Sequence, residues 1–184
     1  EKKIDFVFGQ MMSNYISVKY LNEIRKFNIP IFNIAMDDKL PFNWSYKNKT
    51  LMGAIGLSKS VDLTLTTDPD ACLKYQIHRA NSVFIPLGSK LEIYENNKKE
   101  RDIDVLFIGN KYGVRGNLVS YLLNKGVKIS AWGNGFDNGY ADFNKSIELM
   151  SSSKIIIGFS TLGHCRDRYT LKLRDFDATM SGAL

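Results

Sequence analysis

Short apolar runs with the character of β-strands alternate with helical segments along the whole chain, and this order constrains the fold more than any other feature of the sequence. Parallel strands need a crossover connection, which is usually a helix, so strand–helix alternation is typical of parallel sheets. The strands of such sheets are covered on both faces and therefore read as short apolar stretches. The order predicts an α/β protein built from Rossmann-like parallel sheets. The strand-like runs occupy residues 4–8, 31–36, 63–67, 82–86, 103–109, 127–132 and 155–159.

Helical periodicity fills the intervals between these runs. After the first run, four apolar residues recur at helical spacing and predict one face of a helix of about fourteen residues. Those residues are Tyr20, Leu21, Ile24 and Phe27. Another helix is expected to begin at Asp68, a favourable N-cap residue that is followed by proline. Further helices are expected over residues 51–57, 115–125 and 145–150, and from about residue 171.

A polar stretch without sustained periodicity, residues 89–102, interrupts the alternation, which then restarts. A break of this kind is typical of the linker between two domains. We therefore expect one Rossmann-like domain over residues 1–88, a linker over 89–102, and a second Rossmann-like domain over 103–184. Both domains are expected to be incomplete in this chain.

Composition narrows the classes of function. The net charge is +6, from 25 basic and 19 acidic residues, but the basic residues are scattered and form no helix face interleaved with aromatics. This pattern disfavours nucleic acid as a partner. No apolar run approaches the roughly 20 residues of a membrane span, and no signal-peptide pattern is found, so a cytoplasmic protein is expected. Two cysteines and two histidines, each far apart, predict no dedicated metal site.

Ligands of open parallel sheets bind at the carboxyl ends of the strands, so the loops that follow the strands are the candidate sites. The loop at residues 109–116 is bounded by glycines and opens a helix. Backbone amides after Gly109 and the helix N-terminus favour an anion there, and Lys111 and Arg115 supply positive charge for a diphosphate. The competing interpretation is an ordinary strand–helix turn with solvated charges.

Two further strand ends carry candidate catalytic groups. Asp37 and Asp38 close the second strand, where one carboxylate is able to hold a sugar hydroxyl or act as a base. Adjacent residues of an extended chain point in opposite directions, so only one is expected to face the site, and a turn-forming pair is the alternative. His164 lies in the loop after the strand at 155–159, beside two arginines.

The last helix carries a recognisable motif. Residues 171–184 read Leu-Lys-Leu-Arg-Asp-Phe-Asp-Ala-Thr-Met-Ser-Gly-Ala-Leu. This segment resembles the Lys-x-Arg-Asp-Phe-Glu-x-x-x-Ser-Gly signature of the spore-maturation CgeB-type glycosyltransferases. Residues 107–115, 132–135 and 153–157 are similar to further blocks of that family in the same order. The resemblance covers residues 100–184 well and residues 1–88 only loosely.

The resemblance implies a GT-B fold, related to the large group of retaining glycosyltransferases that use nucleotide-sugar donors. It implies that residues 1–88 belong to the acceptor-side domain and residues 103–184 to the donor-binding domain. Asp177 takes the place of the family's usual glutamate, which binds the ribose hydroxyls of the donor. Lys172 and Arg174 are implied to face the diphosphate with Arg115. Gly182 closes the signature and completes the implied donor-binding set.

These observations predict transfer of a sugar from a nucleotide-diphosphate donor to an acceptor of unspecified kind. No cofactor is expected, and a divalent cation is expected at most as a loosely bound bridge on the diphosphate. An alternative of another class is a non-catalytic module that binds a nucleotide or sugar in the same fold, which the shorter Asp177 favours. A regulatory domain of the flavodoxin type is a third interpretation, but it requires a single domain and conflicts with the linker.

Overall fold

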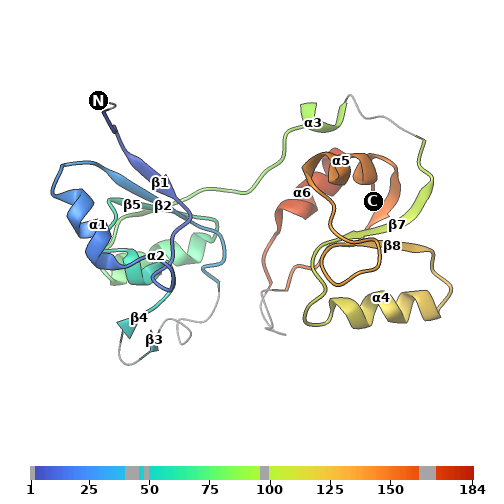
Figure 1. Cartoon of the computed structure of the whole chain (residues 1–184), viewed down its shortest axis with the longest axis horizontal. Coiled ribbons are helices and arrows are strands. Elements are labelled where there is room, and N and C mark those ends of the chain that lie inside the picture. Colours follow the sequence, from blue (N-terminus) through green and yellow to red (C-terminus); the bar gives the residue numbers. More distant parts are fainter. Residues whose placement is uncertain (1–2, 40–45, 48–49, 96–99, 162–168) are drawn as a thin grey trace. The chain divides into compact units, whose positions relative to one another are not determined.

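The chain forms two compact units, residues 1–86 and 87–184, each with a parallel sheet of its own (Figure 1). The structure is a computed structural model that describes residues 3–39, 46–47, 50–95, 100–161 and 169–184. The strands alternate with helices, so the predicted α/β class with Rossmann-like parallel sheets is confirmed. No helix within the described ranges is both long and apolar enough to cross a membrane.

The sheet of the first unit has four parallel strands in the order β1-β2-β5-β6. These strands are β1 (Val7–Gly9), β2 (Ile31–Ala35), β5 (Leu63–Thr66) and β6 (Ser82–Phe84). A small antiparallel pair is formed by β3 (Tyr46–Lys47) and β4 (Thr50–Leu51). The helices are α1 (Val18–Arg25), the 3-10 helix η2 (Ile55–Leu57) and α2 (Pro69–Ile77). The order of these four strands in the sheet follows their order along the chain.

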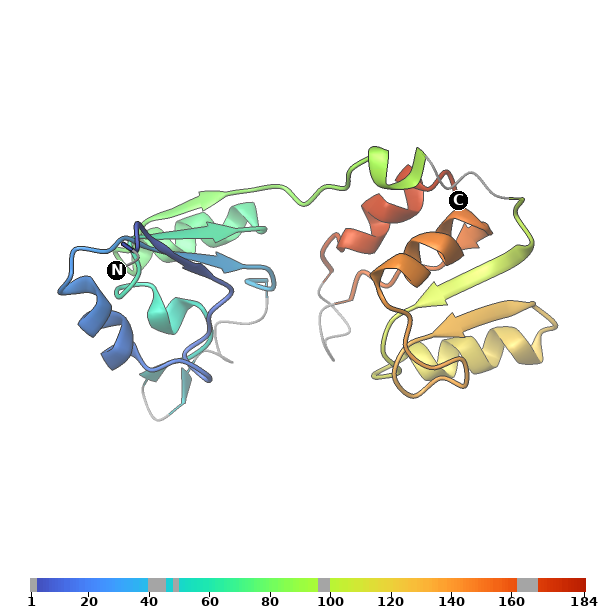
Figure 2. The same cartoon turned by 45° about the horizontal axis from the view of Figure 1, so that its top comes forward.

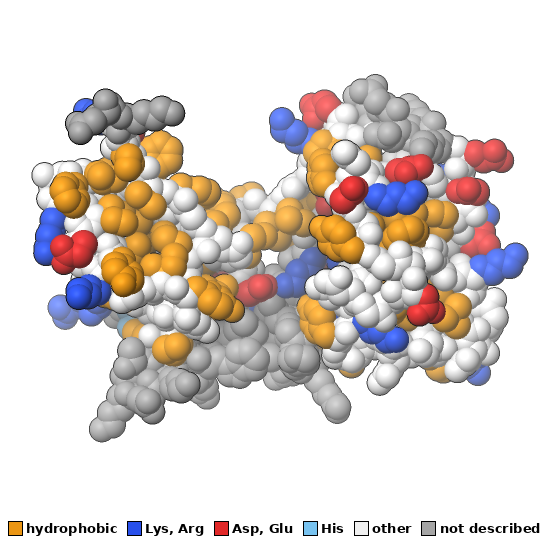
Figure 3. All heavy atoms as spheres, viewed as in Figure 1, with side chains coloured by type: hydrophobic (Ala, Val, Ile, Leu, Met, Phe, Trp, Pro, Cys, Tyr) orange, Lys and Arg blue, Asp and Glu red, His pale blue; other side chains and the backbone are white. Residues whose placement is uncertain are grey.

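One face of this sheet packs against the helices. Ile31 of β2 is fully buried with Leu21 of α1 and Leu57 of η2. On the same face Thr64 and Thr66 of β5 are buried, whereas Leu63 and Leu65 on the opposite face are only half-buried. The polar residues of this strand are thus more buried than its apolar ones. On the opposite face Phe8 is 55 % exposed. Figure 3 shows hydrophobic side chains gathered on the surface of this unit.

Two details of the first unit differ from the sequence prediction. Helix α1 has 8 residues rather than about fourteen, and Tyr20 and Phe27, expected on its packed face, are 67 % and 76 % exposed. The expected helix at residues 51–57 is also wrong, because the segment contains the end of β4, a turn and η2. Gly56 allows η2 to lie close to β4, since a Cβ atom on it would lie 2.5 Å from the carbonyl oxygen of Leu51. The N-cap at Asp68 with Pro69 opening the helix is confirmed.

The second unit has three parallel strands in the order β8-β7-β9. They are β7 (Ile103–Ile108), β8 (Ile129–Trp132) and β9 (Ser153–Ile156). Helices lie on both sides of the sheet, with α4 on one side and α5 and α6 on the other (Figure 2). The helices are α3 (Glu92–Glu95), α4 (Arg115–Asn124), α5 (Phe143–Ser151) and α6 (Leu173–Met180).

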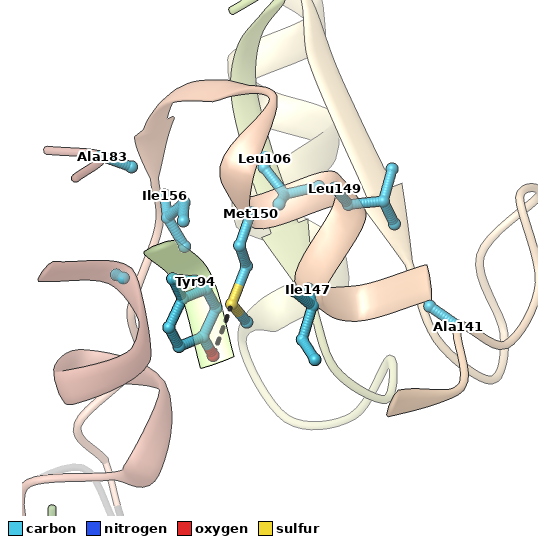
Figure 4. Close-up of a cluster of buried hydrophobic side chains, with 9 residues drawn as sticks. Tyr94, Leu106, Ala141, Ile147, Leu149, Met150, Ile156 and Ala183 are labelled. Carbon is cyan, nitrogen blue, oxygen red and sulfur yellow. Dashed lines mark hydrogen bonds between the residues drawn. The ribbon is translucent and has the colours of Figure 1, made fainter. Parts of the chain in front are cut away.

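The central strand β7 supplies both cores of this unit, because consecutive side chains of a strand point to opposite faces. Leu106 is fully buried among side chains of α5 and β9, including Met150 and Ile156 (Figure 4). Phe107 is fully buried on the other face, with Val119 of α4 and Phe159. The covered faces explain why β7 reads as an almost continuous apolar run.

The segment predicted as a linker, residues 89–102, is not wholly separate from the second unit. It contains the short helix α3, and Tyr94 of that helix is only 6 % exposed. Tyr94 packs with Leu106, Met150 and Ile156 in the core that Figure 4 shows. The described part of this segment therefore contributes to the folded core of residues 87–184.

Leu106→Ala is expected to lower the free energy of unfolding by about 2–5 kcal/mol, because it leaves a cavity at the centre of the sheet. Urea denaturation followed by circular dichroism measures this change. Leu123→Ala provides the matched control, since Leu123 of α4 is 52 % exposed. An equal loss in the two variants would contradict the assignment of Leu106 to the core.

Candidate functional site

The strand order of the second unit creates one natural binding position. The chain leaves β7 through α4 to β8 on one side, and then passes through α5 to β9 on the other side of β7. Loops that follow β7 and β9 therefore diverge at the carboxyl edge of the sheet. A crevice at such a switch of direction is where open α/β sheets bind ligands.

The loop after β7 is joined tightly to the end of β8. The amide of Gly109 donates to the carbonyl of Trp132 at 2.8 Å, and the amide of Lys111 donates to that of Asn134 at 2.9 Å. Gly109 has a φ of +151°, and Gly133 lies so close that a Cβ atom on it would be 2.3 Å from the Gly109 carbonyl oxygen. Gly133 is thus required by the approach of the two backbones, and Gly109 by its positive φ.

These hydrogen bonds change the role expected for the loop. The amides of Gly109, Lys111 and Tyr112 already donate to backbone carbonyls of Trp132, Asn134 and Asn110. We expected amides directly after Gly109 to approach an anion, but these three amides are already hydrogen-bonded within the protein. Positive side chains at the same edge become the stronger candidates for holding an anion.

Arg115 is the first residue of α4 and lies almost entirely within the protein. It is 8 % exposed, and its guanidinium carbon lies 4.0 Å from the ring centroid of Tyr112. The rings of Phe107 and Phe159 lie 6.0 and 5.8 Å from the same carbon. Its Nη1 donates to the Asn110 carbonyl at 3.2 Å. Aromatic faces attract the cation and leave its remaining N–H groups available in one plane.

Arg174, in the first turn of α6, approaches the same place from another element. Its guanidinium carbon lies 5.5 Å from the Phe107 ring centroid. A Cβ atom on Gly109 would be 2.8 Å from Nη2 of Arg174 and 3.4 Å from Nη1 of Arg115. The two guanidinium groups therefore converge on Gly109, although 58 residues lie between Arg115 and Arg174 along the chain.

The two guanidinium groups of this cluster have no close ion pair. Within the described ranges no carboxylate lies within 4.0 Å of either guanidinium as an ion pair, and the buried Nη1 of Arg174 has no hydrogen-bond partner there. Burial lowers the pKa of Arg174 and the charge of Arg115 lowers it further, while the charges of Asp175 and Asp177 offset part of this shift. A buried cation without a partner is unfavourable, so an anion bound between the two groups would relieve both effects.

Asp175 follows Arg174 but its carboxylate faces elsewhere. Its Oδ2 accepts the amide of Lys172 at 2.8 Å and so caps α6. A Cβ atom on Gly158 would lie 2.7 Å from Oδ1 of Asp175, so the end of β9 and the start of α6 are in close contact. This cap places Arg174 at the edge of the sheet.

The two lysines of the expected site have less direct positions. The methylene groups of Lys111 pack over Gly116 and Gly135, and its Nζ lies 5.5 Å from the ring centroid of Phe136. Lys172 is half-buried at the N-cap of α6. Both lie on the segments that carry the arginine pair, Lys111 in the loop before Arg115 and Lys172 two residues before Arg174.

Asp177 and Gly182 lie further along the same helix. The Oδ1 atom of Asp177 accepts a hydrogen bond from the hydroxyl of Ser89 at 2.6 Å. Gly182 follows the end of α6 with a φ of +74°, where a Cβ atom would lie 2.9 Å from Nη2 of Arg101. Arg174 lies in the first turn of α6, whereas Gly182 lies two residues beyond its last residue, Met180. Gly182 therefore serves the end of the helix rather than the arginine cluster.

The first unit holds Asp38 at the carboxyl end of β2. Its Oδ2 accepts hydrogen bonds from Thr66 at 2.7 Å and from the phenol of Tyr75 at 3.0 Å. Burial raises the pKa of Asp38, and the nearby charge of Asp68 adds to this effect. Asp38 thus links β2, β5 and α2, while its neighbour Asp37 is half-buried. The role of either group in catalysis stays a prediction.

His164 lies outside the described residues, so its position does not enter this site. The described ranges contain no group of three or more histidine, cysteine, aspartate or glutamate side chains arranged to hold a metal ion.

Several residues of the site escaped the sequence prediction. Phe107, Tyr112 and Phe159 surround Arg115, and Ser89 and Tyr94 adjoin Asp177. A tyrosine three residues before Arg115 was a usable signal for stacking. No comparable signal marked Ser89 or Tyr94, because both lie in a polar segment without periodicity.

No family model matches this chain, and a search of curated proteins gives no significant match.

The environment of Asp38 predicts a pH dependence of stability. Because burial raises its pKa above the usual 3.8, the folded state binds the proton more tightly than the unfolded chain. The contribution of Asp38 to the free energy of unfolding is therefore largest in acid and falls as the pH rises through the folded pKa. Asp38→Asn cannot ionise, so the stability of wild type relative to this variant should fall between pH 4 and pH 7. Urea denaturation at several pH values measures it, and parallel curves would contradict the prediction.

Proposed function

We propose that this chain is a nucleotide-sugar-dependent glycosyltransferase of the GT-B type, whose residues 87–184 bind the diphosphate of the donor. The observation that carries the proposal is the convergence of Arg115 and Arg174 on Gly109, at the switch of strand order, with no carboxylate ion pair among the described residues. Two planar guanidinium groups side by side match the oxygens of a diphosphate.

The chemistry of sugar transfer suits such a pair. The bond between the anomeric carbon and the diphosphate oxygen breaks, and the leaving nucleoside diphosphate gains negative charge. Cations held close to the diphosphate stabilise that charge more in the transition state than in the bound donor. Because Arg115 is held by aromatic rings and Arg174 by the helix cap, little rearrangement is needed at that moment.

In this proposal the first unit supplies the acceptor side. Asp37, Asp38 and His164 remain the candidates for a group that accepts a proton from the attacking hydroxyl. The raised pKa of Asp38 suits a base that works closer to neutral pH than an ordinary aspartate. Its two hydrogen-bond donors, Thr66 and Tyr75, would then orient the carboxylate.

A non-catalytic binding module of the same fold is the second candidate. The engagement of Asp38 by Thr66 and Tyr75 favours it, because a carboxylate that is held in this way also serves simply to join secondary-structure elements. Incubation with nucleotide sugars separates the two functions. Release of nucleoside diphosphate supports the transferase, whereas binding without release supports the module.

Arg174→Ala is expected to weaken the binding of inorganic pyrophosphate about tenfold or more, because a hydrogen bond to a charged group contributes about 1.5–3 kcal/mol. Isothermal titration calorimetry of the full chain measures the affinity. Lys125→Ala is a matched control, since it removes one positive charge whose ammonium lies by the Tyr121 ring, away from the cluster. Equal effects of the two variants, or no binding by wild type, would refute the assignment of the anion site.

Pyrophosphate binding is expected to persist after exhaustive chelation of divalent cations, because two arginines already supply the positive charge. Calorimetry with and without a chelator tests this expectation. Loss of binding that a single divalent cation restores would instead show that the cation forms part of the site.

A further inference from the structure

The start of the second unit is bonded to its last helix through Asp177. The hydroxyl of Ser89 donates to Oδ1 of Asp177 at 2.6 Å, across 88 residues of sequence. Ser89 precedes α3 and belongs to no helix or strand. A short hydrogen bond to a carboxylate is among the stronger kinds, so this contact orients the Asp177 side chain.

Tyr94 anchors the same segment in the core of the unit. Its ring is buried among Leu106, Met150 and Ile156, and its hydroxyl donates to the sulfur of Met150 at 3.9 Å (Figure 4). Burial and, after it, the nearby charge of Asp177 raise the pKa of Tyr94 to about 12. Tyr94 therefore fixes the segment that carries Ser89 close to Asp177.

The carboxylate of Asp177 keeps capacity for a ligand after this contact. A carboxylate accepts about four hydrogen bonds, so the bond from Ser89 leaves about three acceptor positions. Asp177 and Arg174 are three residues apart on α6 and therefore address the same side of the helix. A ligand whose anion is held by Arg174 is thus able to present hydroxyl groups to Asp177.

We propose that Ser89 is a positioning residue, which holds Asp177 so that it accepts the ribose hydroxyls of a nucleoside diphosphate. This inference rests on the proposed function, because it needs the diphosphate to be bound at Arg115 and Arg174. It adds residues 87–95 to the nucleotide site and makes the preference for ribose over deoxyribose depend on Ser89.

The test compares three ligands by calorimetry with the full chain: inorganic pyrophosphate, the tightest-binding member of a panel of four ribonucleoside diphosphates, and its 2′-deoxy counterpart. Ser89→Ala is expected to weaken the ribonucleotide about tenfold, the 2′-deoxynucleotide clearly less and pyrophosphate not at all. Ser89→Thr should restore the ribonucleotide affinity, since it retains a hydroxyl.

Thr179→Ala is the matched control, because Thr179 is exposed on α6 and its hydroxyl donates to the Phe176 carbonyl at 2.8 Å. This variant should bind all three ligands as wild type does. Unchanged or tighter binding of the ribonucleotide by Ser89→Ala, while wild type binds pyrophosphate, overturns this inference alone. Equal weakening of all three ligands also overturns it, as a general loss of structure. If wild type binds neither pyrophosphate nor any nucleotide of the panel, the proposed function is overturned as well.

Discussion

The ring of Phe107 joins the interior of the second unit to its charged edge. It is fully buried on β7, stacks edge-on against Phe136 and Phe159, and lies beneath the guanidinium groups of both Arg115 and Arg174. The aromatic surface attracts each of the two like charges and so offsets part of their repulsion. The position of β7 at the centre of the sheet therefore determines where the cations meet.

The strands and the direction of the chain were predictable because their signal is local. Apolar runs such as that of β7 depend only on burial at both faces, and the expected helix at 115–125 agrees closely with α4 (Arg115–Asn124). Helix α1 was predicted too long because Phe27 continues the helical spacing of apolar residues. The regular helix nevertheless ends at Arg25, and Phe27 is exposed. The segment at 51–57 failed because Gly56 permits a close backbone approach that no helical period reveals.

The candidate site was predictable only in part. The rule that ligands bind after parallel strands led to Arg115, and the motif of the last helix led to Arg174, so both arginines were found. The occupied amides of the 109–112 loop depend on pairing with β8, which lies more than twenty residues away along the chain. The burial of Tyr94 depends on residues of α5 and β9, so the polar sequence around it gave no sign that it would enter the core.

The contact between Ser89 and Asp177 also bears on how the second unit folds. Residues from both ends of this unit meet there, and β7 pairs with β9 across a crossover of about fifty residues. Closing such long loops costs entropy before any contact forms, so proteins with high contact order fold slowly. The final helix is consequently held by a contact with the first residues of the unit, which forms only after the chain between them has folded back.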